Sequence, residues 1–167
     1  MHKAYVERGL QPTEPKKARA GNLLFVMHGP DGQLLEYTQY LPDSLHSLDR
    51  GKHLGEHQIS QHMFQASTPV RDIVAERTFY TTKLSFKDAA SGGTELYIAG
   101  NSRDRIELQS DSPATKPRVI FAAKNIRNTA KDLRSRSLSV QKGAHTVFVT
   151  DPDGAVIAFQ VHAESGK

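Results

Sequence analysis

The sequence predicts an α+β fold with a mixed or antiparallel sheet, and three observations support this prediction. Short strand-like segments are interspersed with single helical segments, without a crossover helix after every strand. Two pairs of strand-like segments are joined by the same Pro-Asp-Gly turn, which is typical of a β-hairpin. Hairpins in place of alternating crossover helices disfavour a doubly wound nucleotide fold, and since neither G-x-G-x-x-G nor G-x-x-x-x-G-K-[ST] occurs, a nucleotide cofactor is not implied.

Composition narrows the class of protein. Apolar residues make up 37% and charged residues 24% of the 167 residues, as in a folded globular domain. The chain has no cysteine, which excludes disulfides, thiolate nucleophiles and cysteine zinc sites. It has no long apolar run and no apolar core near Met1 of the kind a signal peptide needs. We therefore expect a cytoplasmic protein that does not bind membranes.

The net charge of +4 raises the question of nucleic-acid binding. The basic residues are scattered along the chain, and the basic segment from Arg127 to Arg136 also contains Asp132, as a solvated helix face would. Aromatic residues do not alternate with basic ones as in base-stacking proteins. We expect no nucleic-acid partner.

The first hairpin recurs later in the chain at a constant offset of 122 positions. GPDGQLLEYT, which begins at Gly29, corresponds to DPDGAVIAFQ, which begins at Asp151. Both copies read as a strand, a tight turn and a second strand. The copies differ in one chemically important place, because Glu36 in the first corresponds to Ala158 in the second.

A helical segment precedes each hairpin. AYVERGL ends at Gly9, a residue suited to a left-handed helix cap. IRNTAKDLRSRSL places Ile126, Ala130 and Leu133 on one face. Both segments are therefore predicted to be helices that pack against the neighbouring strands.

The middle of the chain follows a similar order. MFQASTPV reads as a strand, and Asp72 can cap a following helix, DIVAERTFYTTKL. After the turn at SGG come two short strands, ELYIAG and RIELQS, then the linker DSPATKP and the strand RVIFAA. The predicted order is strand, helix, strands, linker, strand, helix and strands.

Residues 40–61 form a long polar connector that we expect either to pack as an arm or to join two modules. Within it, HLGEH matches the H-x-x-E-H spacing of some zinc sites. Gly55 and the lack of a long apolar helix argue against such a site here.

Several of these segments together resemble the vicinal oxygen chelate superfamily, which includes glyoxalase I, extradiol dioxygenases and bleomycin-binding proteins. AERTFYTTKLSF, RIELQS, NIRNTAKDL and DPDGAVIAFQ are similar to its first helix, fourth strand, second helix and closing hairpin. The resemblance implies paired βαβββ units that form a half-open mixed sheet, preceded by a partial third unit. The implied boundaries are residues 1–40 for the partial unit, 41–61 for the connector and 62–167 for a complete module with units 62–112 and 116–162.

The resemblance also implies where a divalent metal such as Fe, Mn, Ni or Zn would be held. The corresponding positions of the complete module are Gln65, Glu107, Arg118 and Ala158. Arginine and alanine cannot ligate a metal, so no metal is expected in this module and Gln65 and Glu107 are only weak candidates. The partial unit has an acid, Glu36, at the corresponding position. Glu36 is either one ligand of a metal site that another chain completes, or a solvent-facing side chain.

Arg118 has two interpretations. In a concave pocket near Glu107 its guanidinium would form an internal ion pair or bind a carboxylate or phosphate; at the strand start it would be a surface cation beside Lys116. The aromatic residues Tyr80, Tyr97, Phe121 and Phe148 either line a pocket or belong to the core, and Tyr97 and Phe121 are the ligand-binding candidates among them.

The leading hypothesis is a glyoxalase-like protein that has lost its metal site and binds a small molecule through Gln65, Glu107, Arg118, Tyr97 and Phe121. Whether it is an enzyme stays open. One alternative is a metal-dependent lyase or dioxygenase whose active site contains Glu36 and is completed by a second chain. The other is a part with a purely structural role in a longer polypeptide or an assembly. An unpaired sheet edge in the partial unit further predicts a homodimer or other homo-oligomer.

Overall fold

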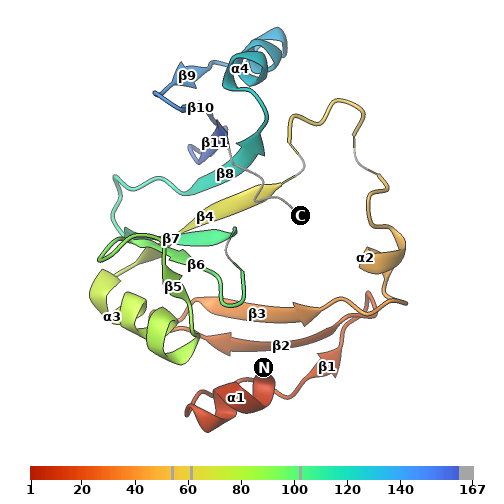
Figure 1. Ribbon diagram of the computed structural model, residues 1–167, viewed down its shortest axis with the longest axis vertical. Coiled ribbons are helices and arrows are strands. Elements are labelled where there is room, and N and C mark those ends of the chain that lie inside the picture. The colour runs from red at the N-terminus through yellow and green to blue at the C-terminus, as the bar shows by residue number, and fades with distance from the viewer. Residues whose placement is uncertain (54, 61, 102, 162–167) are drawn as a thin grey trace. The chain divides into compact units, whose positions relative to one another are not determined.

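The computed structural model describes residues 1–161 except residues 54, 61 and 102 (Figure 1). Its contacts divide the chain into two compact units. Residues 1–56 and 74–85 form what we call the N-terminal unit, and the described residues of 57–73 and 86–161 form the sheet unit. The predicted α+β class with a mixed sheet is confirmed. Three predicted boundary residues, 61, 162 and 167, lie outside the described part of the chain.

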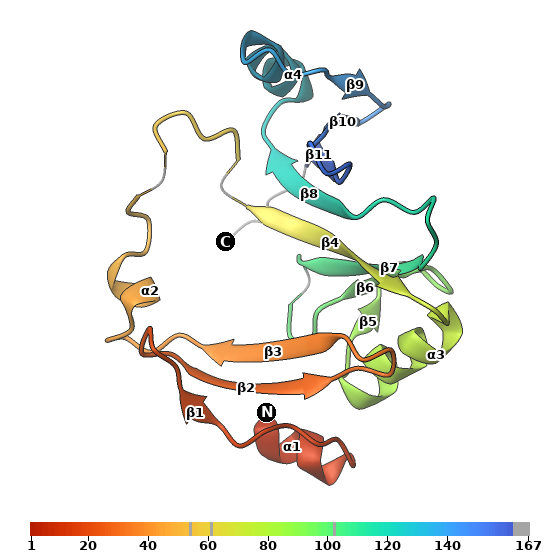
Figure 2. The same cartoon turned by 180° about the vertical axis from the view of Figure 1, so that it is seen from behind.

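The N-terminal unit contains a three-stranded sheet in the order β1-β2-β3. Its first elements are helix α1 (His2–Glu7) and strands β1 (Lys16–Lys17), β2 (Leu23–His28) and β3 (Leu34–Gln39). Both strand pairs are antiparallel, and α1 lies along one side of β2 (Figure 2). A short helix α2 (Leu45–Leu48) follows within the connector.

Aromatic residues form the core between α1 and this sheet. Tyr5 on α1 is buried and makes edge contacts with the rings of Phe25 and Tyr37, which stack on each other with centroids 5.2 Å apart. Phe25 and Tyr37 are cross-strand partners, so their pairing places both rings on the face toward α1. Burial, together with a hydrogen bond to Tyr5, raises the pKa of Tyr37 well above its ordinary value.

The helix predicted after Asp72 is present and packs in the N-terminal unit. It runs as α3 (Ile73–Thr78) and continues as a π-helical turn η1 (Phe79–Lys83). The domain boundaries predicted from the sequence are continuous ranges of residues and do not group this helix with residues 1–56. These boundaries stay a prediction.

A buried carboxylate on α3 accepts hydrogen bonds from the first hairpin and so links the two elements. Glu76 is 1% exposed and accepts hydrogen bonds from the backbone N–H of Asp31 at 2.9 Å and from Nε2 of Gln33 at 2.6 Å. A buried ionised group needs such donors, because without them the loss of hydration is not compensated. The turn residues of the hairpin therefore supply the partners of the helix acid.

The two Pro-Asp-Gly hairpins share one strand register. Val26 pairs with Glu36 in the first hairpin, and Phe148 pairs with Ala158 in the second. All five cross-strand pairs of the second hairpin have a counterpart in the first at the offset found in the sequence. Glu36 and Ala158 are therefore equivalent positions.

The two turns also match. The N–H of Gly32 donates to the carbonyl of Gly29 at 3.0 Å, and the N–H of Gly154 donates to the carbonyl of Asp151 at 3.0 Å. Gly32 and Gly154 have φ values of +85° and +88°, a left-handed conformation that glycine adopts without strain. The turn chemistry thus fixes the register on either side of it.

The sheet unit contains an eight-stranded sheet in the order β5-β6-β7-β4-β8-β11-β10-β9. Its strands are β4 (Met63–Val70), β5 (Lys87–Asp88), β6 (Glu95–Tyr97), β7 (Arg105–Ser110), β8 (Arg118–Ala123), β9 (Gln141–Lys142), β10 (Thr146–Thr150) and β11 (Val156–Val161). Helix α4 (Ile126–Ser135) packs against β10 and β11.

The two halves of this sheet have the same topology. In each half the first strand lies parallel to the last, β4 beside β7 and β8 beside β11. The halves meet where β4 and β8 run antiparallel. This is the arrangement of two βαβββ units that the sequence resemblance predicts.

Alternation along β8 and β11 divides apolar side chains between the two faces. Phe121 and Phe159 pack with Ala130 and Leu133 beneath α4. Ile120 and Ala158 pack with Phe64 in a separate cluster. Since successive side chains point to opposite faces of a strand, this second cluster marks the face away from α4. No helix in the described residues is long and apolar enough to span a membrane.

Candidate functional site

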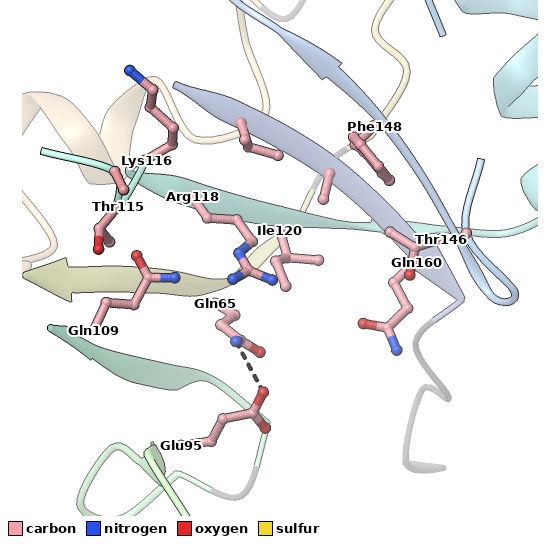
Figure 3. Close-up of a pocket in the computed structure, with 14 residues that line it drawn as sticks. Gln65, Glu95, Gln109, Thr115, Lys116, Arg118, Ile120, Thr146, Phe148 and Gln160 are labelled. Atoms are coloured by element: carbon pink, nitrogen blue, oxygen red, sulfur yellow. Dashed lines mark hydrogen bonds between the residues drawn. The ribbon is translucent and has the colours of Figure 1, made fainter. Parts of the chain in front are cut away.

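The face of the sheet away from α4 contains a pocket of about 690 Å³ that belongs wholly to the sheet unit (Figure 3). Strands β4, β6, β7, β8, β10 and β11 and the linker before β8 contribute its walls. The lining residues are Gln65, Glu95, Gln109, Ala114, Thr115, Lys116, Arg118, Ile120, Gly143, Thr146, Phe148, Val156, Ala158 and Gln160. Polar and charged residues line the pocket together with apolar ones.

An irregularity in β4 brings two adjacent side chains to the face of the sheet that contains the pocket. The register between β4 and β8 shifts between Met63 and Gln65, as at a β-bulge. Phe64 packs with Ile120 and Ala158, while Gln65 lines the same pocket as those two residues. Phe64 is 1% and Gln65 3% exposed, so both consecutive side chains are buried. A regular strand would have placed one of them on each face.

Gln65 is held by its nitrogen. Nε2 donates to Oε1 of Glu95 at 3.1 Å and to Oε2 of Glu107 at 3.4 Å. These two carboxylates fix which end of the amide faces them, because only the NH₂ end can donate to an acid. Among the described residues, Oε1 of Gln65 then has no hydrogen-bond partner, although this atom is buried. The pocket wall therefore presents an unsatisfied acceptor.

Arg118 places its guanidinium near the same carboxylate, and Figure 3 shows its side chain extending toward Gln65. Nη2 lies 3.4 Å from Oε1 of Glu107, and 2.9 Å from the side-chain oxygen of Gln109 when that amide faces the guanidinium with its oxygen. Within the described chain, Nη1 and Nε have no partner. The side chain is 42% exposed, so donors remain accessible from the pocket.

The second acid of the pocket has a cation of its own. Oε2 of Glu95 accepts from Nη1 of Arg105 at 2.8 Å, a good charge-assisted hydrogen bond. The Arg105 guanidinium also lies over the rings of Phe64 and Tyr97, with its Cζ atom 5.4 Å and 5.9 Å from their centroids. Glu95 is thus neutralised locally, whereas Glu107 has weaker, longer contacts.

The charges in and next to the pocket sum to a single positive excess. The pairs Arg105–Glu95 and Arg118–Glu107 cancel, which leaves the charge of Lys116 on the pocket wall. A cavity with this balance attracts an anion more than a cation.

The structure brings three predicted residues together. Gln65, Glu107 and Arg118 are joined by hydrogen bonds, and Ala158 lies on the same wall at the fourth position of the set. Phe148, an alternative aromatic candidate, also lines the pocket.

Two aromatic ligand candidates lie elsewhere. Phe121 stacks on Phe159 with ring centroids 5.8 Å apart in the core beneath α4, so its predicted place in the pocket is corrected. Its neighbour Ile120 faces the pocket instead, because adjacent strand residues point to opposite faces. Tyr97 is not among the lining residues and lies against Arg105. Tyr80 is buried in the N-terminal unit.

Glu36 lies in the N-terminal unit and is exposed. Oε1 accepts a hydrogen bond from the hydroxyl of Thr38 at 2.7 Å. Its neighbour Tyr37 faces α1, so Glu36 lies on the opposite, uncovered face of the hairpin.

Sequence reasoning missed Glu95, Gln109 and Lys116. Glu95 pairs across the strands with Glu107, so the two acids share a face. The alternating pattern of RIELQS gave a signal for Gln109, which is two residues beyond Glu107 and so on the same face. Lys116 stands in the linker, where no periodicity predicts a direction.

The side chains at these positions do not fit a divalent metal. Gln65 turns its nitrogen toward both acids, and Arg118 is a permanent cation 3.4 Å from Glu107. Over the described residues, no group of three or more histidine, aspartate or glutamate side chains is arranged to hold a metal ion. The donor set instead suits an internal ion pair and an organic anion.

Comparison with known proteins bears on the fold. No protein family model matches the sequence, and no curated protein matches it. Solved structures do match. A catechol 2,3-dioxygenase superimposes with a TM-score of 0.63 at 15% identity, over 99% of this chain and 66% of that chain.

Two further dioxygenases give similar values. The 2,3-dioxygenase LapB from Pseudomonas sp. KL28 has a TM-score of 0.60 at 13% identity, over 96% of this chain and 66% of that one. Homoprotocatechuate 2,3-dioxygenase from Arthrobacter globiformis has a TM-score of 0.58 at 19% identity, over 95% and 55%. The chain thus spans 55–66% of the length of these three enzymes. The likeness, together with the paired βαβββ topology, shows that this chain has the vicinal oxygen chelate fold.

Proposed function

We propose that the sheet unit binds a small organic anion in its pocket and that Arg118 is the principal contact. The observation that carries the proposal is the half-exposed guanidinium, whose Nη1 and Nε atoms have no partner within the described residues. A guanidinium offers two parallel N–H donors to a carboxylate, which makes it well suited to this ligand class. A pocket of about 690 Å³ has the size that small-molecule sites usually have.

The test measures binding of phenylacetate by isothermal titration calorimetry. Wild-type protein is expected to bind it, and Arg118→Glu is expected to abolish binding, because the substitution replaces the attracting cation with an anion. Arg134→Glu, at an exposed position of α4, makes the same charge change outside the pocket and should leave binding unchanged. Equal binding by wild type and Arg118→Glu would contradict the proposal.

We propose that the chain forms a homo-oligomer through β3. Strand β3 has six residues, and within the described strands it pairs on one side only, with β2. The open edges of the larger sheet, β5 and β9, are two residues long. A long unpaired edge offers backbone donors and acceptors to another strand. Light scattering over a range of concentrations should give a mass above that of one chain, and a constant monomer mass would contradict this.

The metal-dependent lyase or dioxygenase, with Glu36 as a ligand completed by a second chain, stays an alternative. The exposure of Glu36 is compatible with it but does not favour it, because the described neighbour of this carboxylate is the hydroxyl of Thr38. Near-stoichiometric metal that Glu36→Ala removes would support this alternative over simple anion binding.

A further inference from the structure

We infer that the ligand is a monoanionic carboxylate with a hydroxyl group on the carbon next to the carboxylate and an apolar body. This inference rests on the proposed anion-binding function and deepens it. The observation that leads to it is the unpartnered Oε1 of Gln65, which is buried on the pocket wall. A buried acceptor without a partner is costly, and a ligand that donates a hydrogen bond to it removes that cost.

The orientation of the Gln65 amide determines that the ligand must be a hydrogen-bond donor at this position. Its Nε2 atom already donates to Glu95 and Glu107, so a rotation that exchanged nitrogen and oxygen would turn the oxygen toward two acids. The amide therefore cannot serve the ligand as a donor. The ligand must supply the hydrogen, as a hydroxyl group does.

The charges select a monoanion. One positive charge, that of Lys116, remains after the pairs Arg105–Glu95 and Arg118–Glu107 cancel. A monoanion neutralises this remaining charge, whereas a dianion such as a phosphate monoester would leave a net negative charge in the site without a partner. A carboxylate instead matches both the charge and the planar guanidinium.

The distance between the two polar contacts is short. Nε2 of Gln65 and Nη2 of Arg118 lie 3.4 Å from Oε2 and Oε1 of the Glu107 carboxylate, so the ends of the two side chains lie beside the same group. A ligand that reaches both side chains therefore needs its donor close to its acid group. A hydroxyl on the carbon adjacent to the carboxylate meets this requirement.

The rest of the pocket accommodates an apolar group. Ile120, Phe148, Val156 and Ala158 are apolar residues of its lining, and Figure 3 shows Ile120 next to Arg118 and Phe148 farther from the guanidinium. An aryl or branched alkyl group packed there gains free energy by leaving water. Mandelate, which joins a phenyl ring to an α-hydroxy acid, combines these features and serves as the probe.

The experiment compares three compounds on the unmodified protein. They are mandelate, measured as each enantiomer in turn, phenylacetate, which lacks the hydroxyl group, and O-methylmandelate, which keeps the oxygen but cannot donate. One mandelate enantiomer is expected to bind about tenfold more tightly than phenylacetate and O-methylmandelate. Equal affinities for all three would overturn the inference and leave anion binding intact. Absence of phenylacetate binding would instead count against the proposed function itself.

A variant locates the effect. Gln65→Leu removes the acceptor, and the preference for mandelate over phenylacetate should fall to less than about twofold. Gln141→Leu, at an exposed position of β9, is the matched control and should keep the preference. A preference that persists in a folded Gln65→Leu protein would overturn the assignment to this side chain. Should that variant fail to fold, the comparison with O-methylmandelate still decides the matter.

Discussion

The guanidinium of Arg118 lies 3.4 Å from the carboxylate of Glu107, which is longer than the 2.7–2.9 Å of a well-formed ionic hydrogen bond. The two groups therefore neutralise each other in part without using up the donors of the arginine. Because the pair is loose, the guanidinium of Arg118 stays on the pocket wall and can still donate hydrogen bonds to a ligand.

Removing the negative charge of this pair should strengthen anion binding. Glu107→Gln is expected to increase the affinity for phenylacetate about two- to fivefold, because the ligand no longer competes with an internal carboxylate for Arg118. Calorimetry measures the change, and Glu7→Gln on the exposed face of α1 is the control. Weaker binding by Glu107→Gln would mean that the acid holds Arg118 in its binding position.

Loss of the buried acid in the N-terminal unit should destabilise the protein. Glu76→Ala leaves the donors of Asp31 and Gln33 without their acceptor and is expected to lower the free energy of unfolding by about 2–3 kcal/mol. Urea denaturation measures this loss. Glu7→Ala should change the midpoint little, since Glu7 is exposed. An unchanged midpoint for Glu76→Ala would show that these contacts do not contribute to stability.

Alkaline pH should destabilise the aromatic core. Burial and the hydrogen bond to Tyr5 raise the pKa of Tyr37 above its ordinary value of 10.0, and burial raises that of Tyr80. Because the unfolded chain loses these protons first, their contribution to stability is complete below about pH 10 and falls as pH rises further.

Tyr37→Phe isolates this effect. Wild type should lose more unfolding free energy than the variant between pH 9 and pH 11. The difference should be less than the ~1.4 kcal/mol per pH unit of one complete proton, because the unfolded tyrosine, with its ordinary pKa of 10.0, is only partly ionised over this range. Urea denaturation at both pH values measures the two losses. Identical losses in the two proteins would contradict the role given to Tyr37.

The sheet unit should not retain a divalent metal. After incubation with manganese, iron, nickel or zinc and desalting, mass spectrometry is expected to find well below one metal per chain, since Arg118 opposes a cation beside Glu107. Near-stoichiometric metal that Glu107→Ala abolishes would contradict this expectation, whereas metal removed by Glu36→Ala would point to the N-terminal unit.

Much of the fold could be predicted because its signals are local. The Pro-Asp-Gly turns fix both hairpins, and the shared register makes Glu36 and Ala158 equivalent, as the sequence offset predicts. The faces of β8 were harder to assign. Arg118 and Ile120 face the pocket, while Phe121 belongs to the core beneath α4, and aromatic character alone did not separate these cases.

Other parts of the site depend on contacts that sequence does not encode locally. The irregularity between Met63 and Gln65 brings Phe64 and Gln65 to one face, and no glycine or proline marks it. The orphaned oxygen of Gln65 follows from two acids on other strands, Glu95 and Glu107. Such partners become visible only once the strands are paired.

The most direct test of the account is a crystal structure with 4-bromomandelate, in which anomalous scattering locates the bromine. We expect the carboxylate against the guanidinium of Arg118, the hydroxyl within hydrogen-bond distance of Oε1 of Gln65, and the bromine on the side of Phe148. A bromine peak outside the pocket, or a carboxylate that does not touch Arg118, would contradict the central claim.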